Sequence, residues 1–126
     1  MKKSIICPIM LLALVHGQAL AHNVSLNIHN TLSACVAIYI RDTSIHANML
    51  LANTVFQLRK PIGECGCRSA LVSYDSVTIV NTAPQVLQNG LIGISKSGNK
   101  TLALASEQAL VTDRQIQLQF RCAPAL

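Results

Sequence analysis

The chain has 126 residues, 51% of them hydrophobic, and a formal net charge of +5 at neutral pH. This length fits a single domain, and the hydrophobic content excludes a disordered polymer. Aromatic residues make up only 3% and Trp is absent, so the core must be built mainly from Val, Ile, Leu and Ala, and we expect it to need covalent support.

The positive charges are scattered along the chain rather than gathered into a stripe. Lys2 and Lys3 stand at the amino terminus, and Arg59-Lys60 is the one adjacent basic pair after them. Nucleic-acid-binding surfaces combine a basic stripe with interleaved aromatic residues, and this sequence has neither. We therefore expect solvated surface charges and no nucleic-acid partner.

Residues 1–21 have the pattern of a cleaved signal peptide. Two lysines precede an apolar stretch over residues 5–15, and Ala19-Leu20-Ala21 matches a small-residue cleavage site, which places the cut before His22. The apolar stretch has about eleven residues, fewer than the ~20 that span a bilayer. The sequence thus predicts a mature chain of residues 22–126 in the periplasm or outside the cell, with no membrane anchor after processing.

A second export signal, the lipoprotein cleavage box, is matched by the letters of Leu32-Ser33-Ala34-Cys35. In lipoproteins this box follows the apolar region directly, whereas polar residues between positions 16 and 31 intervene here. We therefore favour processing before His22 over attachment of a lipid at Cys35.

Four cysteines remain after removal of the leader: Cys35, Cys65, Cys67 and Cys122. A bond between Cys65 and Cys67 would close a strained small ring, so each is expected to pair with a distant cysteine. Two pairings stay open, Cys35–Cys65 with Cys67–Cys122 and Cys35–Cys67 with Cys65–Cys122. Each bridge would stabilise the domain by about 3–4 kcal/mol on the chain-entropy model. A Cys-x-Cys pair can also bind soft metals, but four cysteines in an exported chain favour a structural role.

Alternating apolar and polar residues predict two strands in the first third of the mature chain. The first covers residues 24–29 and ends at the turn-prone Asn30-Thr31. The second covers residues 34–40, where apolar residues on both faces indicate burial. Residues 41–44 are expected to break the second strand. The next segment is ambiguous, since residues 49–52 fit a helical turn whereas residues 54–58 fit a strand.

A further strand is predicted after the cysteine pair. Residues 70–80 are rich in β-branched and aromatic side chains, and Tyr74, Val77 and Ile79 are its expected core residues. We expect a bend at Asp75-Ser76 in the middle of this strand.

The pattern of the last third of the chain predicts three more strands, of which the last is clearly amphipathic. Residues 86–95 contain Gly and Asn and fit a bulged strand, residues 96–99 fit a hairpin turn into a strand at 101–104, and residues 105–111 fit one helical turn. The final strand alternates strictly over residues 115–122. Its apolar face carries Ile116, Leu118, Phe120 and Cys122.

Six to eight short strands without a long helix predict an all-β fold. This pattern favours a small antiparallel β-sandwich or a Greek-key barrel held by two disulfides. A parallel sheet is disfavoured because no crossover helix is available. We expect residues 22–126 to form a single domain.

The segment around the cysteine pair resembles a family of small exported Gram-negative proteins of unknown function. The resemblance is carried by Cys65-Gly66-Cys67-Arg68-Ser69-Ala70-Leu71, by Ser73-Tyr74, and by the positions of Cys35 and Cys122. It implies export and cysteine pairing, and it brings no activity with it.

No catalytic pattern stands out in the sequence. No serine lies in a Gly-x-Ser-x-Gly elbow, and the chain has only five acidic residues from which a carboxylate pair could be assembled. We therefore expect a non-enzymatic exported domain that binds a protein partner, as an inhibitor, an immunity protein or an accessory protein, without a cofactor.

A copper-binding protein is the alternative of a different class. Cleavage after Ala21 would expose the α-amino group and imidazole of His22, which together can chelate copper, and this arrangement is similar to the histidine brace of periplasmic copper proteins. His29 and His46 are the available third ligands. The chain lacks the local motifs of those families, so the hypothesis depends on the new amino terminus alone.

Overall fold

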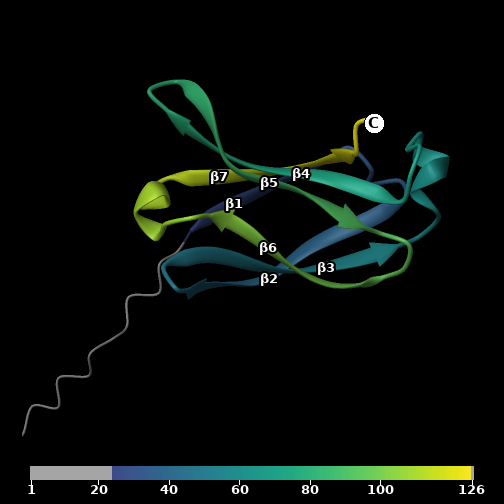
Figure 1. Ribbon diagram of the computed structural model, residues 1–126, viewed down its shortest axis with the longest axis horizontal. Coiled ribbons are helices and arrows are strands. Elements are labelled where there is room, and N and C mark those ends of the chain that lie inside the picture. Colours follow the sequence, from purple (N-terminus) through teal and green to yellow (C-terminus); the bar gives the residue numbers. More distant parts are fainter. Residues whose placement is uncertain (1–23, 126) are drawn as a thin grey trace, which may run out of the picture.

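The computed structural model describes residues 24–125 of the chain. The predicted leader, the cut before His22 and Cys7 lie outside the described residues. Seven strands and two short 3-10 helices follow one another (Figure 1): β1 (Ser25–Asn30), β2 (Val36–His46), β3 (Met49–Leu58), η1 (Ile62–Cys65), β4 (Leu71–Val80), β5 (Ala83–Gly93), β6 (Gly98–Ala105), η2 (Gln108–Val111) and β7 (Gln115–Cys122). Among the described residues, no helix has the length and apolar character needed to cross a membrane.

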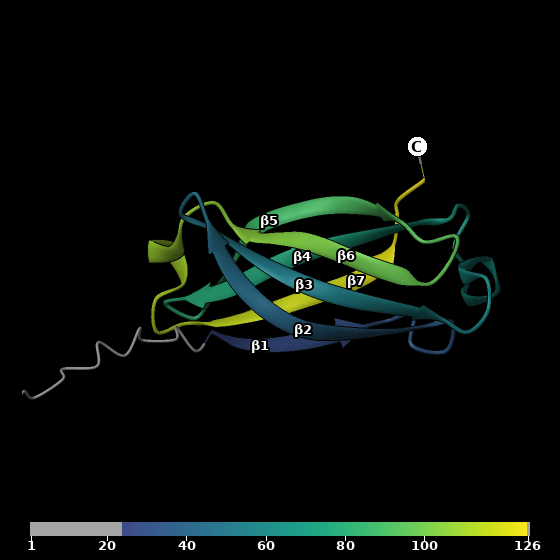
Figure 2. The same ribbon diagram turned by 90° about the horizontal axis from the view of Figure 1, so that it is seen from below.

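The strands form two sheets that pack face to face (Figure 2). One sheet has the order β1-β7-β4-β5, and the other has the order β2-β3-β6. The prediction of an all-β fold with two packed sheets and two disulfides is therefore confirmed. One pair departs from the antiparallel arrangement, because β1 runs parallel to β7. No crossover helix is needed for this pair, since the first and last strands are joined by all the rest of the domain.

The core lies between the two sheets and contains both phenylalanines. Phe56 on β3 and Phe120 on β7 are fully buried, and their rings meet edge to face with centroids 5.8 Å apart. Such an aromatic pair contributes about 0.5–1.5 kcal/mol beyond the area it buries. Ile116 and Leu118 are also fully buried, whereas Gln115 and Gln117 are exposed, so the predicted faces of the last strand are confirmed.

The second strand is longer than predicted. Residues 41–44, expected to break it, belong to β2, and a register shift between Ile40 and Asp42 accommodates the change in pattern. Ala47 and Asn48 then form a two-residue turn in which both residues have positive φ, as type I′ hairpin turns require. Residues 49–52, which the sequence left ambiguous with a helical turn as one possibility, belong to β3, because they pair with β2 and β6 on both sides.

The pair β4 and β5 forms a long hairpin. Asn81 and Thr82, both with positive φ, make its turn, and β5 begins at Ala83 rather than at the predicted residue 86. The predicted bend corresponds to a register shift between Ser76 and Val77. Tyr74 and Val77 are buried as expected, but Ile79 is 57% exposed. The core assignment of Ile79 was wrong because Thr78, opposite the buried Ile116, faces the core, so the next residue points to the outer face of the sheet, beyond the end of the pairing with β7.

Candidate functional site

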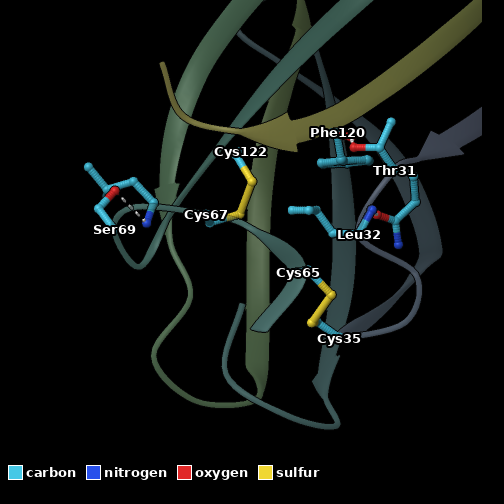
Figure 3. The surroundings of a disulfide bond; sticks show 10 residues. Thr31, Leu32, Cys35, Cys65, Cys67, Ser69, Phe120 and Cys122 are labelled. Carbon is cyan, nitrogen blue, oxygen red and sulfur yellow. Dashed lines mark hydrogen bonds between the residues drawn. A yellow bond between two sulfur atoms is a disulfide. The ribbon is translucent and has the colours of Figure 1, made fainter. Parts of the chain in front are cut away.

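The two disulfides are Cys35–Cys65 and Cys67–Cys122, which settles the pairing that the sequence leaves open. Both lie at the same end of the sandwich (Figure 3). Cys35 directly precedes β2 of one sheet, and Cys122 ends β7 of the other. The segment that carries Cys65 and Cys67 therefore ties both sheets together at one place.

The local backbone explains why neighbouring cysteines reach different sheets. η1 ends at Cys65, and Gly66 follows with a φ of 93°, in the left-handed region that favours glycine. The chain thus changes direction between the two sulfur-bearing residues. Cys35 is fully buried and Cys67 nearly so. Because all four sulfurs are in disulfides, none is a thiolate that could bind a metal or attack a substrate.

The turn between β1 and β2 is held against this end of the sandwich by polar groups. The Asn30 side chain donates to the Val36 carbonyl over 2.8 Å and accepts from the Leu32 amide over 2.9 Å. Both the amide and the hydroxyl of Thr31 donate to the Phe120 carbonyl on β7 (Figure 3). The two bridges and these hydrogen bonds hold the strands together at this end of the sandwich. We call the pair of bridges, Cys35–Cys65 and Cys67–Cys122, the disulfide clamp.

The predicted copper ligands do not gather in the described part of the chain. His29 lies near the end of β1, next to the turn that leads into β2, and His46 lies at the far end of β2. Ten residues of extended chain separate these two ends by roughly 30 Å, so one ion cannot bind both side chains. His22 lies outside the described residues. Among residues 24–125, no group of three or more His, Cys, Asp or Glu side chains is placed to hold a metal, and the copper hypothesis stays a prediction about the amino terminus.

The most distinctive surface feature is the end of the β4–β5 hairpin, which we call the hairpin tip (residues 79–86). Beyond Thr78 no third strand of the described chain pairs with β4, so the tip is two-stranded. Figure 1 shows it projecting away from the rest of the sandwich. Ile79 and Val86 are 57% and 60% exposed, and no charged residue occurs between positions 76 and 95. The tip thus presents uncharged, apolar side chains to its surroundings.

The remainder of β5 forms the edge of its sheet. Leu91 lies on the outer face and is 59% exposed. On the side away from β4, a shallow hollow of about 400 Å³ separates residues 90–93 of β5 from residues 100–102 of β6, the edge strand of the other sheet. The two sheets therefore leave an open seam along this side of the sandwich, which we call the β5–β6 seam.

Tyr74 ties the two sheets beneath this seam. Its hydroxyl donates to the Ala103 carbonyl on β6 over 3.1 Å. Burial raises the pKa of the Tyr74 hydroxyl, so it remains a protonated donor at neutral pH. Gly90 on β5 allows the ring to lie there, because a Cβ at that position would stand 2.7 Å from Tyr74 Cε1.

Two further hollows lie elsewhere on the surface. One of about 380 Å³ adjoins the base of the hairpin tip and is lined by Ile79, Asp113, Arg114 and polar residues of β1 and β7. Another of about 280 Å³ lies beside the Cys67–Cys122 bridge, with Arg68 on its wall. None of the three hollows is lined by a histidine or by more than one carboxylate. Their residues do not form an acid–base pair of the kind that hydrolytic sites use.

A family model described as "Uncharacterized protein conserved in bacteria (DUF2195)" matches residues 9–125. The chain belongs to this family. The resemblance seen around the cysteine pair is thereby confirmed. No curated protein and no solved structure matches the chain. Membership of this family assigns no activity to the chain.

The cysteines were predicted to form disulfides, but the β4–β5 hairpin was not predicted as a candidate site. Composition gave no distinctive signal, because the twenty uncharged residues at 76–95 are fewer than the thirty-seven uncharged residues at 4–40. The exposure of Ile79 and Val86 could not be predicted locally, since it depends on which face of β4 and β5 the other sheet covers and on where β7 ends beside β4. The disulfides agree with an extracytoplasmic location, where such bonds form and persist.

Proposed function

We propose that the chain is an exported, non-enzymatic protein-interaction domain of the periplasm or the cell exterior, and that the β4–β5 hairpin contacts its partner. An inhibitor, an immunity protein or an accessory protein would each use such a domain. The observation that carries the proposal is the exposure of Ile79 and Val86 on a projecting two-stranded tip without charged residues.

The energetics of the tip support a partner. An isolated two-stranded hairpin is only marginally stable in water, and apolar side chains on it gain nothing from exposure. Burial of a Val or Ile side chain contributes about 1.5–3 kcal/mol when it is complete, so covering the exposed parts of Ile79 and Val86 would contribute on the order of 2–3 kcal/mol. A contribution of this size is a substantial part of the free energy of binding to a partner, and it accounts for apolar side chains at the tip.

The arrangement of the molecule also suits this role. The disulfide clamp lies at the end of the sandwich from which β4 starts, and β4 then runs along the sandwich to the tip. The tip is thus presented from a covalently fixed scaffold. A fixed scaffold reduces the conformational entropy that binding must remove, which raises affinity without additional contacts.

Affinity capture from the native cell envelope tests the proposal with a matched pair of variants. The double variant Ile79→Ser and Val86→Ser removes the apolar side chains of the tip. Tyr39→Ser serves as the control, because Tyr39 is 50% exposed on β2 of the other sheet. We expect the double variant to lose the captured partner by at least tenfold, with an unchanged melting temperature, and the control to retain it. Retention of the same partner by the double variant would contradict the proposal.

A further inference from the structure

The four edge strands of the sandwich differ in how they are protected against pairing with another chain. The edges are β1 and β5 in one sheet and β2 and β6 in the other. β1 is only six residues long, β2 carries Arg41 and Asp42, and β6 carries Lys100. Short length and charged side chains are the usual protections of an exposed edge. β5 has eleven residues and no charged side chain.

The first half of β5 has other protections, and the second half has none. Pro84 has no amide hydrogen to donate, and Leu87 is an extra residue that shifts the register between Val86 and Gln88. From residue 88 to residue 93, every residue of β5 has a partner on β4 in regular antiparallel register. The opposite side of this segment carries the unpaired amides and carbonyls of an edge strand.

The β5–β6 seam runs beside this unprotected segment and has one charge. Of the residues that line its hollow, Lys100 on β6 is the one charged residue. Within residues 24–125 the one salt bridge joins Arg121 and Asp75, so the Lys100 ammonium group has no carboxylate partner there. Leu91, exposed at the same place, supplies apolar surface. An edge strand, an apolar side chain and an unpaired cation thus adjoin one hollow.

We propose that residues 88–93 of β5 accept an extended segment of the partner protein as an additional strand, with an apolar side chain of that segment against Leu91 and a carboxylate on Lys100. The inference rests on the proposed function and specifies how the partner is bound. Main-chain hydrogen bonds give affinity in this mode, and the alternating side chains give specificity. A second copy of the chain suits the seam less well, because a two-fold pairing of β5 strands would bring each lysine toward its own counterpart and would supply no carboxylate.

A display library of random twelve-residue linear peptides, selected on the oxidised protein, tests the inference. We expect the enriched peptides to alternate apolar and polar residues and to contain Asp or Glu. Binding of such a peptide should slow hydrogen exchange at least tenfold for the amides of residues 88–93 that point away from β4. Enrichment of no peptide, or protection confined to another strand, would overturn the inference.

Reversal of the charge makes the test specific. Lys100→Glu should weaken the acidic peptides at least tenfold and should enrich Lys- or Arg-containing peptides when the selection is repeated. Lys96→Glu is the matched control, because it makes the same change of charge in the exposed loop between β5 and β6, outside the residues that line the hollow. We expect it to alter the affinity less than twofold. Equal losses in both variants would show general electrostatic attraction and would overturn the inference.

The outcomes also separate this inference from the proposed function. A partner that is captured through Ile79 and Val86 while the library yields no seam-binding peptide would retain the function and overturn strand addition. If sedimentation experiments show a dimer and Leu91→Lys dissociates it, a second copy of the chain is the occupant of the seam. This result would also overturn the inference. A seam-binding peptide without any tip-dependent partner would contradict the assignment of the tip instead.

Discussion

At the scale of single residues, the last strand shows how directly alternation determines burial. Phe120 is fully buried and meets Phe56 across the core, whereas the neighbouring Gln119 lies on the opposite face of β7 and its amide donates to the side chain of Gln117 over 3.3 Å. The two residues are neighbours on the same strand and differ in which face of the sheet their side chains occupy. They form a natural pair for testing the register of β7.

Phe120→Ala should lower the free energy of unfolding by about 3–5 kcal/mol, because it removes a buried ring and leaves a cavity that the surrounding strands fill only partly. Gln119→Ala should change it by less than about 0.5 kcal/mol. Urea denaturation with the disulfides intact measures both values. Similar losses in the two variants would mean that the faces of β7 are assigned wrongly.

At the scale of elements, the fit between β5 and β4 depends on a glycine. Tyr74 is held by its hydrogen bond to Ala103, and its ring occupies the space where a side chain at position 90 would begin. The ring cannot rotate away without losing that bond. β5 can therefore lie over Tyr74 only while position 90 has no Cβ.

Gly90→Ala should destabilise the protein by about 1–3 kcal/mol, because the new Cβ would overlap the Tyr74 ring and force it to move. Gly93→Ala is the control within the same strand, because a Cβ there would have no atom within 4 Å, and it should stay within about 0.5 kcal/mol of the parent. Thermal denaturation followed by circular dichroism compares them. A stable Gly90→Ala protein would show that the Tyr74 ring has space to move.

Strands could be predicted from the sequence where one face is buried and the other is exposed to solvent. β1 and β7 were found in this way, and the disulfide cysteines were found from their number and spacing. Residues 41–44 were assigned wrongly and residues 49–52 stayed ambiguous, because a bulge and two-sided pairing decide their structure, and both depend on distant strands. The candidate site was missed for the same reason, since Ile79 has the apolar side chain of a core residue but alternates with the core-facing Thr78 and therefore lies on the outer face, beyond the end of the pairing with β7.

At the scale of the whole molecule, the two disulfides bridge separations of 30 and 55 residues and connect both sheets at one end. Replacement of Cys67 and Cys122 together by Ala should lower the free energy of unfolding by about 3–4 kcal/mol, and so should replacement of Cys35 and Cys65. Either loss is a large part of the stability of a small domain. Urea denaturation of the two double variants measures the loss, and non-reducing peptide mapping of the parent should find no free thiol among these four cysteines. A free Cys65–Cys67 dithiol would contradict the assigned pairing.

The parallel pairing of β1 with β7 has a practical consequence for how the protein is attached to a surface. Leu26 and Thr78 both pair with Ile116, so the start of β1 lies only two strands away from the base of the hairpin tip. Cys122 pairs with Val72 at the opposite end of the sandwich, beside the disulfide clamp. A resin or biotin tag joined after residue 125 therefore holds the domain with its tip pointing outward, whereas a tag joined before residue 24 places the support at the same end as the surface meant to be recognised.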